Sequence, residues 1–188
     1  ADDQANLNAG SVSADGAWVT YTTRARNAIA DVNDLNGADD VLLYERDTGT
    51  SRLVTRSARA ARVATPGVVF DATPNGRWLT FVSDQAIAGT ADANATTDAF
   101  LYDRDNRRLA LLSVRAGTTT DAANGATTPG AITPDGNWIT LQSAATDLVA
   151  GTSDGNSAFD AFLRDRSTGT TTLLSHAAGS ATTTANDL

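Results

Sequence analysis

A repeat of 60 residues, marked by one tryptophan in each copy, constrains the fold of this chain more than any other feature. Trp18, Trp78 and Trp138 are the three tryptophans of the sequence, and both intervals (78 − 18 and 138 − 78) are 60 residues. Each follows an Asp-Gly or Asn-Gly pair and begins a run of the type Trp-[Val/Leu/Ile]-Thr. Copies of one unit at a fixed interval predict a repeat architecture in which neighbouring units cover one another.

Each repeat contains four short runs rich in Val, Leu, Phe, Tyr, Trp and Thr. Gly, Thr and Asn interrupt every window long enough for a helix, so the runs predict strands. The expected strands cover 9–13, 17–23, 40–46 and 51–56, then 67–72, 77–83, 98–104 and 108–113, then 129–133, 137–143, 160–166 and 170–175. Asp15-Gly16 and its counterparts predict a tight hairpin between the first two strands of each repeat.

Four antiparallel strands in one repeat form a propeller blade. We therefore predict an all-β fold, a β-propeller with three four-stranded antiparallel blades in a single half-propeller domain. The blades cover about 7–56, 67–113 and 128–175.

The surplus length of each repeat lies at one end of its blade. The second turns are long (24–39, 84–97 and 144–159), and so are the links between blades (57–66 and 114–128). In a meander these segments share one end, which we call the long-loop face. Loops held on a rigid scaffold commonly carry binding sites, so we expect a site there or in the central opening.

Two repeated patterns together resemble a known family. They are [Ser/Thr]-[Ala/Pro]-[Asp/Asn]-Gly-x-Trp-[Val/Leu/Ile]-Thr and Asp-[Val/Ala]-[Leu/Phe]-Leu-[Tyr/Arg]-[Asp/Glu]-Arg, followed by a Leu-rich strand. This arrangement is similar to the WD40-like (PD40) repeats of TolB-type β-propellers and covers nearly the whole chain. The resemblance implies a bacterial exported or periplasmic propeller, often a docking platform for other proteins and commonly six-bladed.

Three blades do not close a ring, because closed propellers have at least four. The two end blades would each expose an apolar flank, worth on the order of 10 kcal/mol of burial at about 25 cal/mol/Å². Patches of that size are uncommon on soluble monomers. We therefore predict that two chains associate head to tail around a twofold axis as a six-bladed homodimer. The alternative is that the chain is part of a longer propeller.

An Asp-x-Asn-x-x-x-Asp motif ends the long loop of every repeat. Its residues are Asp34, Asn36 and Asp40, then Asp92, Asn94 and Asp98, then Asp154, Asn156 and Asp160. Ca²⁺ takes six to eight oxygen ligands, and this spacing supplies several from one loop, so the motif predicts a calcium site. The first loop, with Asp31, Asn33 and Asp39 in addition, is the best candidate. The alternative is that Asp and Asn accept backbone N–H groups in Asx turns.

Composition limits the other possibilities. Lys+Arg 14 against Asp+Glu 22 gives a net charge of −8, which argues against nucleic-acid partners. The absence of Cys excludes disulfides and thiolate sites, and no apolar run is long enough to span a membrane. A chain that begins with Ala1 and contains no Met fits signal-peptide removal, so we expect a periplasmic or secreted protein.

Tryptophan and arginine each recur once per blade. The tryptophans could stack on a ligand, but packing of one blade on the next explains them more simply. Arg46, Arg104 and Arg166 could line an anion site or bind a turn carboxylate such as Asp15 or Asp135 within the fold.

These features favour a non-catalytic binding or assembly module whose partner is a protein or a glycan. No Gly-x-Ser-x-Gly elbow or phosphate loop occurs, and His176, the single histidine, has no organised acid partner in the sequence. One alternative is a glycan-active hydrolase or lyase that uses carboxylates in the centre of the ring. Another is a structural subunit of a filament or surface layer.

Overall fold

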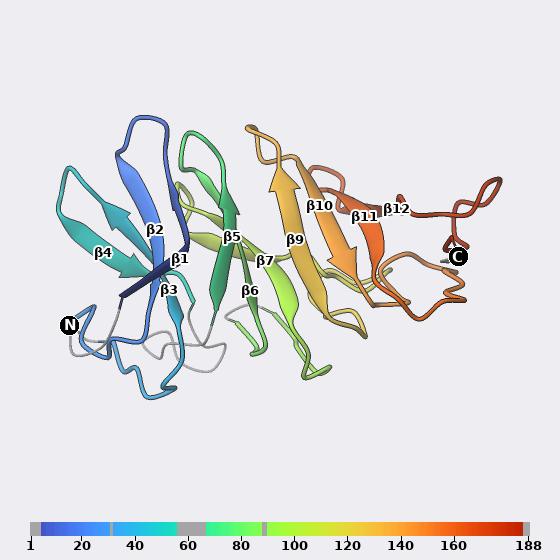
Figure 1. Cartoon of the computed structure of the whole chain (residues 1–188), viewed down its shortest axis with the longest axis horizontal. Coiled ribbons are helices and arrows are strands. Elements are labelled where there is room, and N and C mark those ends of the chain that lie inside the picture. The colour runs from blue at the N-terminus through green and yellow to red at the C-terminus, as the bar shows by residue number, and fades with distance from the viewer. Residues whose placement is uncertain (1–4, 31, 56–66, 88–89, 186–188) are drawn as a thin grey trace.

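The computed structural model describes residues 5–30, 32–55, 67–87 and 90–185, and of residues 5–9 the backbone alone. These residues form twelve strands in three four-stranded antiparallel sheets, each with its strands in chain order. The sheets stand in a row, with the first and last at opposite ends (Figure 1). The prediction of an all-β fold with three four-stranded antiparallel units is confirmed.

The strand bounds follow the predicted runs closely. The first blade consists of β1 (Ala5–Val12), β2 (Trp18–Thr23), β3 (Asp40–Glu45) and β4 (Thr50–Leu53). The second consists of β5 (Val68–Ala72), β6 (Trp78–Ser83), β7 (Asp98–Asp103) and β8 (Arg108–Leu111). The third consists of β9 (Thr127–Ile132), β10 (Trp138–Ser143), β11 (Asp160–Asp165) and β12 (Thr170–Leu173).

The Asp-Gly and Asn-Gly pairs lie in hairpin turns, but the loops are longer than two residues. In the first blade residues 13–17 connect β1 to β2, and the Gly16 N–H donates to the Ser13 carbonyl at 2.8 Å. Gly16 has a φ of +65°, which glycine adopts without strain. The Ser13 hydroxyl donates to Asp15 and accepts from the Trp18 N–H at 3.0 Å, so the conserved spacing within the repeat builds the turn.

The first strand of each blade contains a shift in its pairing register that the sequence did not predict. Pairing shifts register between Asn6 and Ser11 in β1, and β5 and β9 shift at similar places. The threonine two residues after each tryptophan lies opposite the shift. The hydroxyl of Thr20 accepts from the Ser11 N–H at 2.9 Å, and that of Thr80 accepts from the Asp71 N–H at 3.1 Å. β1 accordingly begins at Ala5, earlier than predicted.

Most of the hydrophobic core lies between blades, and a smaller third cluster packs Leu42 and Leu53 of the first blade against Ala28, Ile29 and Val32 of its own long loop. One cluster joins Val41 and Leu43 of the first blade to Phe81 and Phe100 of the second, whose rings stack with centroids 5.3 Å apart. A second cluster joins the second blade to the third through residues such as Leu101, Ile139 and Phe162. Each blade therefore depends on its neighbour for burial.

The long second turns connect β2 to β3, β6 to β7 and β10 to β11, as predicted. Of the two links, 114–128 extends from beyond β8 into the start of β9, whereas 57–66 lies outside the described residues. No helix long and apolar enough to cross a membrane occurs in the part of the chain that the structure describes.

Candidate functional site

The Asp-x-Asn-x-x-x-Asp motif forms a pair of Asx turns in the second blade. Asp92 accepts the Asn94 N–H at 3.2 Å, and Asn94 in turn accepts the Thr96 N–H at 2.8 Å. The Asn94 amide group donates to Asp98, at 3.4 Å, and to the carbonyl of Ala123 in the following link. The oxygen and the amide group of the Asn94 side chain thus both form hydrogen bonds, and these bonds connect the long loop to the link that follows β8.

The other two blades repeat this arrangement. In the first, Asn36 accepts the Ala38 N–H at 2.7 Å and donates to Asp40 at 3.0 Å. In the third, Asn156 accepts the Ala158 N–H at 3.0 Å and donates to the Ala185 carbonyl at 2.9 Å.

The first and last aspartates of the motif are also hydrogen-bonded. Asp34 accepts the Asn36 N–H at 3.3 Å and Asp154 accepts the Asn156 N–H at 3.0 Å. Ser175 donates to Asp160 at 2.8 Å.

The Asx-turn alternative is therefore confirmed as the hydrogen-bonding role of the motif. Within the described ranges, no group of three or more His, Asp and Glu side chains is placed to hold a metal. Of the extra residues in the first loop, Asp39 pairs with Arg24 at 3.3 Å, and Asp31 lies outside the described residues. Calcium binding at this motif stays a prediction.

Burial raises the pKa of the final aspartate of the motif in the first and second blades. Burial raises the pKa of Asp40 to about 7, against hydrogen bonds from Asn36 and Thr55 that favour the charged form. Burial likewise raises the pKa of Asp98 to about 6, although Ser113 donates to it at 2.7 Å. Both carboxyl groups are shielded from solvent, since Asp40 and Asp98 are almost completely buried.

The once-per-blade tryptophan and arginine form the joint between adjacent blades. The guanidinium of Arg104 in the second blade lies over the Trp18 ring of the first, 4.4 Å from its centroid. Arg166 of the third blade lies over Trp78 of the second at 4.2 Å. Packing of one blade on the next, the simpler interpretation of the tryptophans, is thus confirmed at these two joints.

The arginines bind carbonyls of the turn before the tryptophan, not the carboxylates of Asp15 or Asp135 that the sequence suggested. Two of them also form an ion pair with the turn carboxylate next to them in sequence, Arg46 with Asp47 at 3.0 Å and Arg104 with Asp105 at 2.8 Å. Arg46 donates to the Asp15 carbonyl at 3.2 Å, Arg104 to that of Asn75 at 3.0 Å, and Arg166 to that of Gly136 at 2.7 Å. A carbonyl at the tip of the turn faces the guanidinium, whereas the side chains of Asp15 and Asp135 accept from their own turns.

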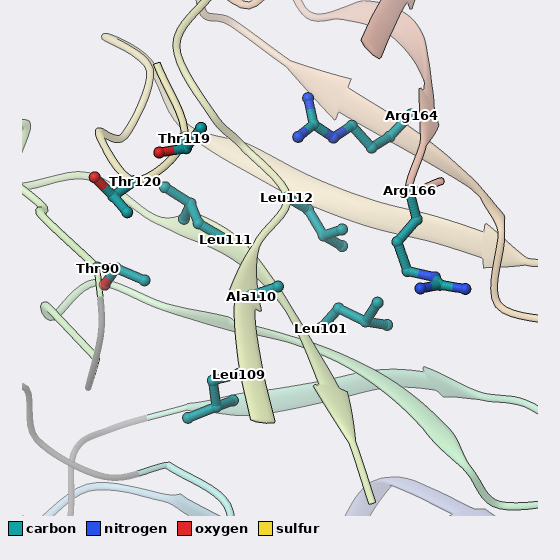
Figure 2. Close-up of a pocket in the computed structure, with 10 residues that line it drawn as sticks. All are labelled: Thr90, Leu101, Leu109, Ala110, Leu111, Leu112, Thr119, Thr120, Arg164 and Arg166. Carbon is teal, nitrogen blue, oxygen red and sulfur yellow. The ribbon is translucent and has the colours of Figure 1, made fainter. Parts of the chain in front are cut away.

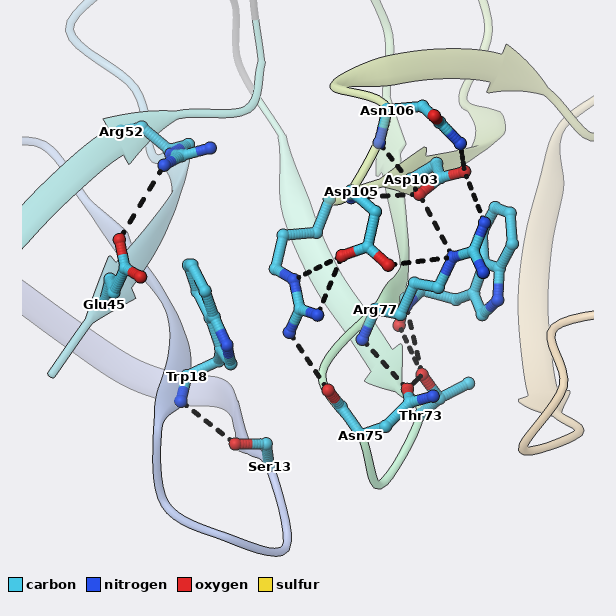
Figure 3. A network of polar contacts seen from close by, with 12 residues as sticks. Ser13, Trp18, Glu45, Arg52, Thr73, Asn75, Arg77, Asp103, Asp105 and Asn106 are labelled. Atoms are coloured by element: carbon cyan, nitrogen blue, oxygen red, sulfur yellow. Dashed lines mark hydrogen bonds and ion pairs between the residues drawn. The ribbon is translucent and has the colours of Figure 1, made fainter. Parts of the chain in front are cut away.

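Arg77 adds a further contact to the second blade. It pairs with Asp103 at 3.3 Å and with Asp105 at 3.4 Å, and its guanidinium lies 4.6 Å from the centroid of the Trp78 ring (Figure 3). Trp78 is thus contacted by arginines from its own blade and from the next.

A cavity of about 260 Å³ lies between the second and third blades. Leu101 and the β8 segment form its apolar wall, and Thr90, Thr119 and Thr120 of the long-loop face line its rim (Figure 2). The Arg164 side chain extends over the leucines toward Thr119 (Figure 2). Arg164 also lines a second cavity, of about 220 Å³, together with residues 114–118.

Arg164 breaks the repeat, because the equivalent positions hold Tyr44 and Tyr102. It is half-buried, and burial lowers its pKa below the usual value. Its Nη1 donates to the Thr171 hydroxyl at 2.9 Å, and no ion pair joins it to a carboxylate within the described residues. The sequence contained the signal for this residue, a cation in place of a recurring aromatic, but only the structure places it beside a cavity.

No family model and no curated protein sequence matches the chain. Solved structures do match. TolB from Agrobacterium tumefaciens aligns with a TM-score of 0.56 and 19% identity, over 93% of this chain and 47% of that one. Dipeptidyl peptidase 4 from Porphyromonas gingivalis aligns with a TM-score of 0.53 and 12% identity, over 95% and 27%. A prolyl endopeptidase, one of two studied together, aligns with a TM-score of 0.51 and 13% identity, over 92% of this chain and 22% of that one.

These comparisons establish the fold. The three sheets have a TolB-like β-propeller arrangement, which confirms the structural part of the resemblance found in the sequence. The chain spans about half the length of the Agrobacterium structure and a smaller share of the two peptidases.

Proposed function

We propose that this chain is a non-catalytic binding module of an exported, periplasmic or secreted protein. Its partner is a protein or a glycan that carries an anionic group, a carboxylate or a sulfate. The site is the cavity beside Arg164, at the long-loop face between the second and third blades.

The observation that carries this proposal is the guanidinium of Arg164, which forms no ion pair with a carboxylate of the described residues. A buried or half-buried charge is costly unless an opposite charge or hydrogen bonds accompany it. Of its five N–H donors, the structure assigns one to Thr171. A carboxylate or sulfate would accept two parallel bonds from the rest, in the geometry that guanidinium groups favour.

The surroundings of Arg164 suit a ligand of this class. Hydroxyl groups of Thr90, Thr119 and Thr120 can donate to or accept from neighbouring polar atoms, while the leucines offer an apolar wall. A cavity of about 260 Å³ is near the lower limit of small-ligand sites, so it would hold one charged sugar or side chain rather than a long polymer. A second arginine, Arg166, also lines the cavity, so two cations and no carboxylate are among its lining residues.

Titration calorimetry with matched acidic and neutral probes tests the proposal. Glucuronate, N-acetylneuraminate, succinate and sulfate are compared with glucose, and the acidic probes should bind while glucose does not. Arg164→Tyr, which restores the residue of the other two blades, should abolish binding without unfolding the chain. Arg108→Ala removes an exposed arginine of β8 outside the cavity and should leave binding unchanged.

Two results would contradict the proposal. Equal binding of glucose and glucuronate, or acidic-probe binding that survives Arg164→Tyr, would show that the guanidinium is not the recognition element. Turnover of a glycan substrate, lost on one Asp→Asn change, would favour the hydrolase alternative.

A further inference from the structure

We infer that two copies of this chain join head to tail, with the third blade of one packed on the first blade of the other. The surface offered by the third blade, here the C-flank, consists of Trp138, Ala161, Leu163 and Leu174. The surface offered by the first blade, the N-flank, consists of Gly16, Val19, Tyr21, Tyr44 and Arg46. The contact would repeat the two joints already present inside the chain.

The internal joints share one construction. A tryptophan at the start of one blade's second strand lies under an arginine of the next blade, at 4.4 Å for Trp18 with Arg104. The turn glycine of that next blade also approaches the ring. A Cβ added to Gly136 would lie 2.4 Å from Trp78, and one added to Gly76 would lie 3.0 Å from the Trp18 Cβ. Glycine at the turn leaves the space that the tryptophan occupies.

The C-flank contains the tryptophan side of such a joint, and in the described structure this side is exposed. Trp138 is 45% exposed, whereas the equivalent Trp78 is 6% exposed. Leu174 is 47% exposed, against 2% for the equivalent Leu112. The residues are therefore those of a blade interface, and the part that covers them in the second blade is the third blade itself.

The N-flank holds the arginine half. Arg46 donates to the Asp15 carbonyl as Arg104 does to that of Asn75, so the guanidinium is already placed above the turn. Its side chain is 55% exposed, against 16% for Arg104. Of the residues that the structure describes, a Cβ added to Gly16 would meet only the Arg46 guanidinium, at 3.2 Å, so the space that tryptophan side chains fill at the other two turns is open.

A second copy of this chain is the partner that these surfaces fit. The two flanks match, position by position, the two sides of the internal joints, because all three blades share one repeat pattern. A pair with twofold symmetry makes the same contact twice, and the second contact then forms within the complex rather than between free molecules. The six blades of the pair would complete a ring.

Light scattering after size exclusion, over a tenfold range of concentration, measures the assembly directly. The wild-type chain should run as one species of twice its 19.4 kDa. Trp138→Arg sets a cation against Arg46, and Arg46→Glu sets an anion against the tryptophan face, so either change should halve the mass. Leu35→Glu alters a long-loop residue that is 74% exposed and outside both flanks, and should leave the mass unchanged.

Mixing the two disruptive variants separates a broken joint from a damaged fold. The mixed pair would contain one native Trp138–Arg46 joint and one Arg–Glu pair, so equimolar mixing should restore the double mass. A wild-type monomer at every concentration, a ladder of masses, or a pair that neither variant disturbs would overturn the inference. The result is independent of the Arg164 site, because Arg164→Tyr should leave the mass of the pair unchanged.

Discussion

Trp78 and Trp138 occupy the same position of the repeat but opposite environments. Trp78 is 6% exposed and lies under Arg166 of the following blade, whereas Trp138, in the last blade that the structure describes, is 45% exposed. The turns and the strand pairing around the two residues are otherwise alike. The difference shows that a blade's own fold does not bury its tryptophan. The neighbouring blade does.

The largest expected effect comes from truncating each tryptophan in turn. Trp78→Ala should lower the free energy of unfolding by about 3–5 kcal/mol, because it leaves a cavity between two blades. Trp138→Ala should cost about 1 kcal/mol, because half of its surface already faces solvent. Urea denaturation followed by circular dichroism, in the Arg46→Glu background that keeps chains apart, measures both. Equal losses would mean that burial within the blade decides the stability.

This dependence on neighbours also explains what the sequence could and could not predict. The strands and turns were predictable, since the Asp-Gly pairs, the threonines and the apolar runs act over a few residues. The contact between Trp18 and Arg104 was not predictable, because the two residues belong to different blades. Each blade contains many other polar residues, and the sequence does not say which of them meets the tryptophan. The once-per-blade recurrence of both residues was a signal of the contact, but not of its geometry.

Alanine substitutions of the turn glycines compare a turn that packs against a tryptophan with a turn that does not. Gly136 and Gly16 both have positive φ, at +72° and +65°, so alanine strains the backbone at each by about 1–2 kcal/mol. At Gly136 the new Cβ would also lie 2.4 Å from the Trp78 ring. We expect Gly136→Ala to cost about 1–3 kcal/mol more than Gly16→Ala, as in other overpacked sites. Thermal unfolding of the two variants in the Arg46→Glu background provides the comparison. Identical losses would place the Trp78 ring elsewhere.

The candidate site shows the same limit of sequence reasoning. The motif at Asp34–Asp40 and its equivalents was visible as a pattern, and the structure gives it a hydrogen-bonding role. Arg164 was visible only as a departure from the pattern, because a cation in place of Tyr44 and Tyr102 says nothing about a cavity until the blades are packed.

The final aspartate of the motif sharpens the comparison, because it is buried in all three blades, including the third, where Asp160 is 6% exposed. Asp40 of the first blade is 2% exposed, and Asp98 of the second blade is 0% exposed. With the folded pKa of Asp40 raised by burial to about 7 from 3.8, its protonated form favours the folded state. The stability it contributes is therefore complete below about pH 4 and is lost as the pH rises through about 7.

Asp40→Asn should remove this dependence and raise the melting temperature at pH 8 by about 2–4 °C, the shift that about 1 kcal/mol produces in a chain of this size. Scans between pH 5 and pH 8 test it, with Asp84→Asn, a change at an exposed loop carboxylate, as the control. A lower melting temperature at pH 8 would mean that Asp40 is held charged by its partners.

The smallest expected effect is that of calcium, and it distinguishes the three loops from the joints. If a loop binds Ca²⁺ with the dissociation constant of an extracellular module, about 10⁻⁴–10⁻³ M, then 1 mM Ca²⁺ stabilises the fold by about 0.4–1.4 kcal/mol. The melting temperature should rise in 1 mM Ca²⁺ relative to chelator, with Mg²⁺ as the control cation. Asp34→Asn should reduce the rise, since it removes a charged ligand from the first loop.

No rise, together with no bound ion in calorimetry, would leave the Asx turns as the whole role of the motif. The same hydrogen-bonded loop would then close the second and third blades without a metal, and the exposure of Trp138 against that of Trp78 would still measure what the neighbouring blade covers.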